Sequence, residues 1–190
     1  MGKLNLLWSA CSNDGGYSIL EKPVARILFD ILNYRAKFMR NFFDDVLKAT
    51  VRYSEEIATA KVDMGKYFFD LFIETDRQII PIELKVDARD QNEQCRRYLE
   101  EVRKKNRNVP ARMYYLTKDK HAPSPGSLKD EKILANDSRA IGTGVVLISY
   151  EDEILTWLES CSRDLQSSNE KNLCYQLELF KDIIREHLKN

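Results

Sequence analysis

The sequence predicts a mixed α/β fold, in which helices cover a mixed sheet with the core order α-β-β-β-α-β and extra helices follow at the C-terminal end. Apolar residues recur at helical spacing over 19–49 and again over 90–105. Between these regions the period changes to short runs rich in Ile, Val, Phe and Tyr. Two later segments, 111–117 and 144–150, are also strand-like. Alternating helical and strand periods of this kind favour a sheet packed between helices.

The first helical region is expected to form two helices that separate near residues 33–35, because the apolar stripe is interrupted there. A helix that begins near Glu21 puts Pro23 in its first turn, where the missing N–H is tolerated. A capping box that begins at Ser18 is the alternative. It would move Pro23 to the fifth helical residue, where the proline ring is costly.

The middle of the chain is expected to form three antiparallel strands, 55–62, 67–74 and 79–86, because polar turns separate these β-like runs. The helix over 90–105 has Asp90 available as its N-cap. The segment 144–150 is apolar enough to be a central strand that is buried on both faces.

The length of 190 residues favours a single domain over 1–190. Its core is expected at 18–162, with a C-terminal helical extension over 163–190. The stretch 118–143 is rich in Pro, Ser, Gly and charge and is too long for an ordinary connection, so we expect a flexible loop.

Composition and cysteine spacing argue against a strongly basic nucleic-acid-binding domain, a zinc protein and a membrane protein. Lys+Arg and Asp+Glu are balanced at 30 each, so any surface that binds nucleic acid must be local. The four cysteines form no CxxC or Cys/His cluster, and we expect reduced thiols rather than a zinc site. No apolar run approaches the ~20 residues that span a bilayer, and the opening residues make a poor secretory signal, so a cytoplasmic protein without membrane contact is expected.

Three charged side chains interrupt the apolar strands. Side chains alternate across a strand, so Glu83 and Lys85 share one face, while Ile82 and Leu84 point into the main core. Asp70 lies on the preceding strand, and a tight meander can bring it opposite Glu83. Two carboxylates and an ammonium then converge.

This convergence has two interpretations. The trio can be an ordinary solvated set of strand charges. However, carboxylates that face each other repel, and an unpaired charge among so many Phe and Ile side chains would cost several kcal/mol.

A divalent metal resolves both problems. Two carboxylates and a main-chain carbonyl, here that of Leu84, suit Mg²⁺, and Mn²⁺ can substitute. Lys85 can hold a water and stabilise charge on a phosphoryl group, and that combination hydrolyses phosphodiesters.

The order Asp70, twelve intervening residues, then Glu83-Leu84-Lys85 resembles the PD-(D/E)XK nuclease superfamily, whose restriction-endonuclease-like core has the predicted element order. The continuation IELKVDARDQNEQCRRYLEEV resembles an uncharacterised bacterial and phage branch with a Gln-x3-Tyr helix, here Gln94 and Tyr98. EKPVARILFDIL, YYLTKDKHAPS and LISYEDEILTWLESC are similar to other parts of that branch, so the likeness spans about 18–162. The His-Ser pair common after the first glutamate is Val24-Ala25 here.

The resemblance implies roles for further residues. Gln94 is expected to orient the metal-bound water or a phosphate, and Glu21 to serve at the metal, directly or through water, unless it only belongs to the capping box. Tyr98 continues an apolar stripe and is expected in the core. The basic residues of the same helix are either a solvated face or contacts to a phosphate backbone. They include Arg96, Arg97, Arg103 and Lys104.

The leading hypothesis is therefore a Mg²⁺-dependent nuclease, an endonuclease acting on DNA. No helix-turn-helix or zinc module is visible in the sequence, so recognition would come from the domain itself, the stretch 118–143, a second copy in a homodimer, or a partner protein. One alternative is a non-catalytic nucleic-acid-binding or scaffold subunit with the same fold. Another is a nuclease that acts on RNA or branched structures, because one fold supports all of these functions.

Overall fold

A six-stranded sheet with the strand order β1-β2-β3-β4-β6-β5 forms the centre of the molecule. The computed structural model describes residues 21–48, 60–64, 69–86, 89–106, 109–137, 142–165 and 170–187. The strands are β1 (Lys61–Asp63), β2 (Leu71–Glu74), β3 (Ile79–Leu84), β4 (Arg112–Thr117), β5 (Ile133–Leu134) and β6 (Gly144–Ser149). Strands β1, β2 and β3 pair antiparallel, whereas β3, β4, β6 and β5 pair parallel. The sheet is therefore mixed, as predicted.

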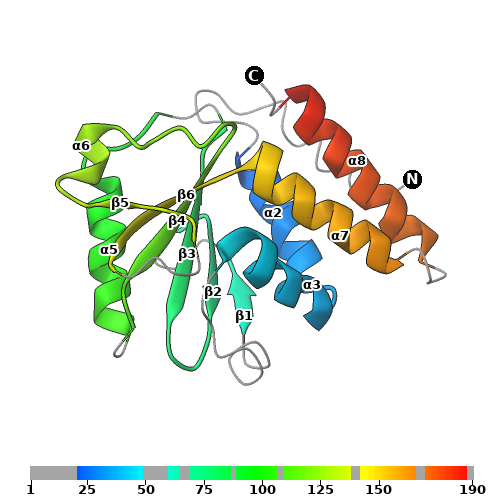
Figure 1. Cartoon of the computed structure of the whole chain (residues 1–190), viewed down its shortest axis with the longest axis horizontal. Helices are drawn as coiled ribbons and strands as arrows, with labels where there is room; N and C mark the ends of the chain where they lie inside the picture. The colour runs from blue at the N-terminus through cyan, green and yellow to red at the C-terminus, as the bar shows by residue number, and fades with distance from the viewer. Residues whose placement is uncertain are drawn as a thin grey trace.

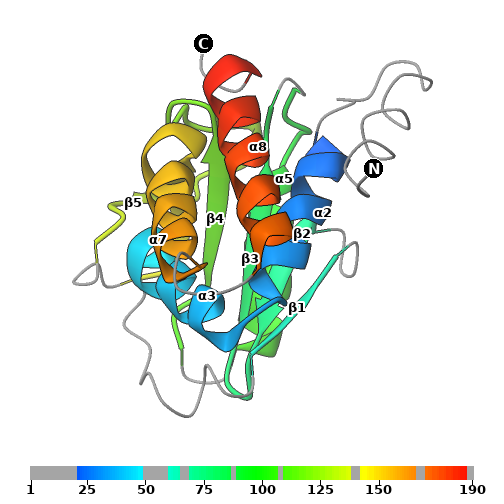
Figure 2. The same ribbon diagram turned by 90° about the vertical axis from the view of Figure 1, so that its right-hand side faces the viewer.

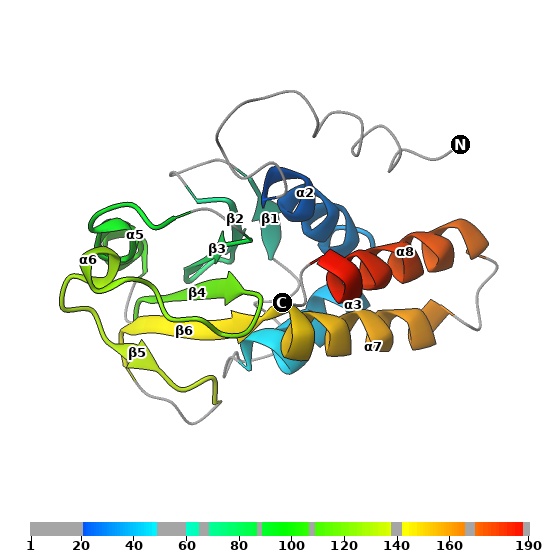
Figure 3. The same ribbon diagram turned by 90° about the horizontal axis from the view of Figure 1, so that it is seen from above.

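Helices cover both faces of this sheet, so the molecule has three layers (Figures 1 and 3). One face carries α5 and α6, and the other carries α2, α3, α7 and α8, which stand in front of the sheet in Figure 2. The helices are α2 (Glu21–Leu32), α3 (Ala36–Asn41), α5 (Gln94–Lys105), α6 (Pro125–Leu128), α7 (Leu155–Leu165) and α8 (Lys171–His187), with π-helical turns η1 (Phe42–Leu47) and η3 (Tyr150–Ile154). The predicted α/β fold and its element order are confirmed.

The alternation of side chains along β3 builds two separate cores. Ile80, Ile82 and Leu84 belong to the larger core, under α2, α3, α7 and α8. Ile79 belongs to the smaller core, which α5 covers. All residues of β3 are buried, because the strand has helices on both faces. Because side chains alternate along the strand, Glu83 is on the same face as Ile79 and Pro81, the α5 side of the sheet, and not in the larger core.

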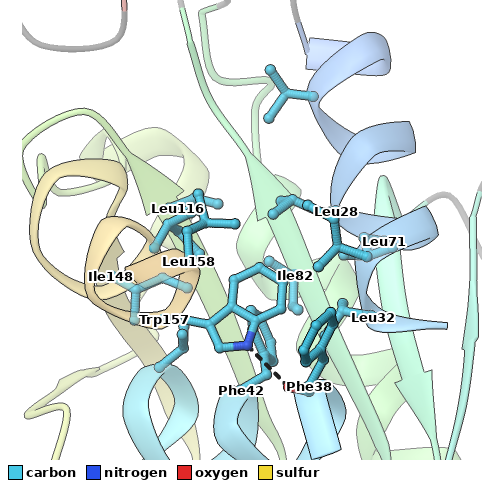
Figure 4. Close-up of a cluster of buried hydrophobic side chains, with 14 of the residues drawn as sticks. Leu28, Leu32, Phe38, Phe42, Leu71, Ile82, Leu116, Ile148, Trp157 and Leu158 are labelled. Carbon is cyan, nitrogen blue, oxygen red and sulfur yellow. Dashed lines mark hydrogen bonds between the residues drawn. The ribbon is translucent and has the colours of Figure 1, made fainter. Parts of the chain in front are cut away.

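Trp157 of α7 lies fully buried at the centre of the larger core (Figure 4). Its ring meets Phe42 edge-on, with 4.9 Å between ring centroids. Its indole N–H donates a 3.0 Å hydrogen bond to the backbone carbonyl of Phe38, which satisfies the one polar atom of the side chain. Trp157 thereby fixes the paired helices α3 and α7 against the sheet.

One predicted boundary between elements is confirmed, and several others differ from the structure. The break between the first two helices is confirmed, because Arg35 is the extended N-cap of α3. Strand β3 ends at Leu84, two residues earlier than predicted. The stretch 118–143 contains regular structure that the sequence did not indicate, namely α6 and the short strand β5, which pairs with β6. Most of the predicted strand 55–62 and the residue Ser18 lie outside the described residues.

The prediction that Asp90 caps the following helix is wrong. Helix α5 begins at Gln94, and its N-cap is Glu93 in a left-handed conformation with φ of 53° and no side-chain cap. The Asp90 carboxylate instead accepts hydrogen bonds from the Tyr115 hydroxyl and from the backbone N–H of Ser124. Tertiary partners therefore replaced the local cap.

Three cysteine thiols in the described ranges are free. Cys95 and Cys161 are buried, and Cys174 is half-buried. Burial raises the pKa of the Cys95 thiol to about 11, so it stays protonated at neutral pH. Cys11 lies outside the described residues. Among the helices that the structure describes, none has the length and apolar character needed to cross a bilayer.

Candidate active site

The register between β2 and β3 brings Asp70 opposite Glu83. Leu71 pairs with Ile82, so the next residues outward along the two strands are Asp70 and Glu83. The backbone N–H of Leu84 donates a 3.0 Å hydrogen bond to Oδ2 of Asp70. This bond holds the half-buried Asp70 side chain across the end of β3.

Glu83 and Lys85 form an ion pair within the same strand end. The Nζ atom of Lys85 lies 2.8 Å from Oε1 of Glu83, and the two side chains are only 11% and 3% exposed. The backbone N–H of Lys85 donates to the carbonyl of Leu116 at 2.8 Å, which continues the pairing with β4 beyond the end of β3. Asp70, Glu83 and Lys85 are thus brought together on the α5 face of the sheet.

Helix α5 adds an amide to this group. Nε2 of Gln94 donates to Oε1 of Glu83 at 2.5 Å and to the Tyr98 hydroxyl at 3.2 Å. Oε1 of Gln94 accepts from the backbone N–H of Gln91 at 3.3 Å, which fixes the amide so that its N–H atoms face Glu83. Tyr98 is half-buried and packs edge-on against Phe69 with 5.0 Å between ring centroids, so it is a core residue whose hydroxyl reaches the site.

Burial and crowding of negative charge change the acidity of the two carboxyl groups. Burial and then the charge of Asp70 raise the pKa of Glu83 to about 8, although Lys85 acts in the opposite direction. Burial also raises the pKa of Asp70, against the opposing effects of the Leu84 N–H and Lys85. For Lys85, burial lowers the pKa, but the charges of Glu83, Glu21 and Asp70 outweigh it, and the net pKa is raised. The ammonium is therefore charged at neutral pH.

One oxygen of Glu83 receives no hydrogen bond from the described residues. Its Oε1 is engaged by Lys85 and Gln94, whereas its Oε2 is buried and has no donor among those residues. The Asp70 carboxylate can accept a hydrogen bond from Glu83 only while Glu83 keeps its proton. A buried carboxylate oxygen without a donor, next to a second carboxylate, suits a hard cation with oxygen ligands. The described residues contain no cluster of three or more His, Cys, Asp or Glu side chains that could hold a metal. An ion here would use the two carboxylates, a main-chain oxygen and water, a set that Mg²⁺ accepts.

Glu21 lies beside the end of β3 but is held differently. Its Oε1 accepts a 3.1 Å hydrogen bond from the backbone N–H of Val86, so the start of α2 is tied to the residues that follow β3. Its charge acts on Lys85, as the raised pKa of that ammonium indicates. Glu21 does not complete a three-residue acidic metal cluster in the described part of the chain.

Tyr150 is a neighbour of this site that the sequence did not single out. It directly follows β6 and is fully buried, and no described residue makes a hydrogen bond to its hydroxyl. Burial, followed by the charges of Glu21 and Asp70, raises the pKa of this hydroxyl well above its ordinary value. The parallel strands β3, β4 and β6 end side by side, and that alignment is the signal that could have pointed to Tyr150.

The basic residues of α5 are largely engaged by acidic neighbours. Arg96 pairs with Glu93 and with Glu100, the latter at 2.9 Å. Arg103 makes two contacts to Glu131, at 2.8 and 2.7 Å. Lys104 lies 3.2 Å from Glu101, and Arg97 donates to the side chain of Gln91 at 3.1 Å. These contacts favour a solvated helix face over a surface prepared for phosphates.

A comparison with protein families gives a match over most of the chain. The sequence model of the PD-(D/E)XK nuclease superfamily matches residues 28–178, which include Asp70, Glu83, Lys85 and Gln94. No curated protein and no solved structure matches the chain at a significant level. The mixed six-stranded sheet with its flanking helices is consistent with the restriction-endonuclease-like fold of this superfamily.

Proposed function

Because the chain belongs to the PD-(D/E)XK nuclease superfamily, we propose that it is a metal-dependent nuclease that hydrolyses phosphodiester bonds of DNA, with Mg²⁺ as its ion. One observation carries the proposal. Glu83 has one oxygen tied to Lys85 and Gln94, while its other oxygen is buried without a donor among the described residues, and its neighbour Asp70 is a second carboxyl group. A purely structural strand end gains nothing from this arrangement, because a buried unpartnered carboxylate oxygen destabilises the fold.

Asp70 and Glu83, with the main-chain carbonyl of Leu84, would hold the ion. A bound Mg²⁺ would polarise the phosphoryl oxygen and lower the pKa of an attacking water. The hydrogen bond from the Leu84 N–H keeps the Asp70 carboxylate in place before any ion arrives. The ligands are therefore pre-organised, and little rotamer freedom is lost on binding.

Lys85 and Gln94 have separate tasks in this proposal. The Lys85 ammonium is charged at neutral pH and anchored 2.8 Å from Glu83. It can donate hydrogen bonds to the water and to the phosphoryl oxygens, where negative charge grows in the transition state. Gln94 holds Oε1 of Glu83 through its amide and thereby leaves the second oxygen for the ion.

A cleavage assay tests the proposal. Purified protein is incubated with circular DNA, linear DNA and RNA in the presence of Mg²⁺ or Mn²⁺, beside Asp70→Ala and Lys85→Ala. Loss of either group is expected to slow cleavage by about 10²-fold or more. Lys37→Ala is the matched control, because this exposed lysine of α3 pairs with Asp164 on the opposite side of the sheet from the site.

The assay separates the proposal from its alternatives. If the wild type and the two site variants process every substrate alike, the nuclease proposal is refuted, and a non-catalytic scaffold becomes the better description. Cleavage of circular DNA establishes an endonuclease. Faster cleavage of RNA than of DNA would support the proposed chemistry of the site and would identify RNA as the preferred substrate.

A further inference from the structure

A cavity of about 600 Å³ lies next to Lys85, at the ends of β3 and β4. Its walls come from the end of β3, the residues just before α5 and the stretch that follows β4. Besides Lys85, the lining includes the basic side chains of Arg89 and Lys118 and the imidazole of His121. The volume lies within the range of ordinary ligand pockets. None of these three further residues takes part in the site chemistry described above.

The acidic residues of the cavity weaken its positive character only in part. Both oxygens of Asp90 are engaged, because one accepts from the Tyr115 hydroxyl and the other accepts from the Ser124 N–H at 2.6 Å. These bonds also join the residues before α5 to β4 and to the stretch after it, so they hold the walls of the cavity together. Asp119 is exposed and is the other acidic side chain of the lining. The balance of side chains favours an anionic ligand.

Thr117 supplies a second, independent observation. It is the last residue of β4, lines the cavity and is only 6% exposed. Its hydroxyl is buried and has no hydrogen-bond partner among the residues that the structure describes. Buried hydroxyl groups almost always have a partner. The described residues provide no such partner, and because Thr117 lines the cavity, a ligand bound there is a candidate for it.

We propose that this cavity binds the phosphodiester backbone of the nucleic-acid strand next to the bond that is cut. Arg89 and Lys118 contact phosphate oxygens, and the Thr117 hydroxyl donates a hydrogen bond to the same backbone. Arginine, lysine and threonine side chains are common partners of phosphate oxygens. The substrate class rests on the proposed nuclease function, whereas the location of the strand rests on the cavity and its side chains.

Binding of labelled oligonucleotides, measured by fluorescence anisotropy in EDTA so that no strand is cut, tests this inference. Single-stranded DNA, duplex DNA and RNA are compared as probes. The double variant Arg89→Gln/Lys118→Gln is expected to bind about tenfold more weakly than the wild type. Each lost phosphate contact should also reduce the slope of log K against log salt concentration by about 0.7–0.9. Lys37→Gln, in α3 on the opposite side of the sheet, is the control and should bind as the wild type does.

Three further variants test Thr117 and Asp119. Thr117→Val keeps the shape of the side chain and removes the hydroxyl, so binding should weaken several-fold, while Thr117→Ser should restore it. Asp119→Asn removes a negative charge from the lining and should tighten binding several-fold. A purely structural role for Thr117 would leave binding unchanged in both threonine variants. Thermal unfolding verifies that each variant is folded. If the double variant does not fold, the affinity of Asp119→Asn tests the inference in its place.

The results distinguish this inference from the proposed function. If the wild type binds none of the probes, or the cavity variants keep its affinity and salt slope, the inference is overturned. Normal cleavage by cavity variants with unchanged binding would overturn it and leave the nuclease function standing. Binding that depends on Arg89, Lys118 and Thr117 in a protein that cuts nothing would support the inference and refute the nuclease function.

Discussion

The backbone N–H of Leu84 donates a 3.0 Å hydrogen bond to the carboxylate of Asp70, and so joins the residue before β2 to the last residue of β3. The position of this carboxylate is therefore set by the sheet itself. A side chain held in this way can be changed chemically without moving its neighbours, provided that the replacement still accepts the hydrogen bond. This property makes Asp70 a suitable place to separate metal binding from folding.

Asp70→Asn should abolish tight binding of a divalent ion and leave the protein folded. The asparagine oxygen can still accept the Leu84 hydrogen bond, but the negative charge that attracts the ion is gone. Calorimetric titration with Mn²⁺ should show binding to the wild type and at least about tenfold weaker binding to the variant. Equal binding by the two proteins would place the ion elsewhere.

Without divalent ions, the free energy of unfolding should fall as the pH rises from about 4.5 to about 8. Burial and then the Asp70 charge raise the pKa of Glu83 from 4.5 to about 8. In this range the folded state binds more protons than the unfolded state, so stability is highest below the lower value and is lost as the pH passes the upper one. The total loss is on the order of a few kcal/mol.

Glu83→Gln is the control for that pH dependence, because a neutral amide does not titrate. Urea denaturation in EDTA across this pH range should give a flatter stability curve for the variant than for the wild type. Addition of Mn²⁺ at pH 8 should stabilise the wild type, since an ion bound only to the folded state adds to stability. Parallel curves for the two proteins would show that Glu83 is not the group responsible.

Gln94→Ala should lower the turnover number by about 10–100-fold, the usual cost of losing a residue that orients a ligand side chain. Its amide holds Oε1 of Glu83 at 2.5 Å, so its loss frees the carboxylate to rotate. Tyr98→Phe removes the hydroxyl that lies 3.2 Å from that amide but leaves the hydrogen bond from Gln94 to Glu83 in place, so it should change turnover by less than about threefold. Steady-state cleavage kinetics would measure both, and equal effects of the two substitutions would contradict a special role for Gln94.

Trp157→Phe should destabilise the fold by about 1–3 kcal/mol without changing the site chemistry. The substitution leaves the Phe38 carbonyl without its 3.0 Å donor and removes buried ring volume. Urea denaturation measures the loss, and cleavage kinetics at low temperature serve as the control. A loss of activity in fully folded Trp157→Phe would mean that the larger core acts on the site directly.

Much of this architecture could be predicted because local patterns and tertiary structure agree. The alternation around Glu83 and Lys85 indicated which face each side chain takes, and the two cores on either side of β3 follow that alternation. The register of β2 against β3 then places Asp70 opposite Glu83, as a tight meander requires. Gln94 was suggested only by resemblance, since nothing in its helical spacing indicates that its amide reaches Glu83.

Other features depend on contacts that no local pattern contains. The position of Asp90 in the sequence is typical of a helix cap. In the structure, however, its carboxylate accepts hydrogen bonds from the Tyr115 hydroxyl and the Ser124 N–H, which lie far away in sequence. Strand β5 has two residues and exists because it pairs with β6. Tyr150 looks like an ordinary end of an apolar strand, and only the alignment of parallel strand ends brings its hydroxyl near Glu21 and Asp70.

The order of the proposed site residues along the chain has a practical consequence. The side chains that would hold the ion and its orienting amide fall between Asp70 and Gln94, whereas Thr117, Lys118 and His121 come from a later stretch that packs alongside them. The proposed strand-binding residues are divided between these two pieces of sequence, because Arg89 lies in the first and Lys118 in the second, and Asp90 joins the two pieces. In the proposed nuclease, exchange of the stretch after β4 should therefore change some contacts to the nucleic acid while Asp70, Glu83 and Gln94 keep their places.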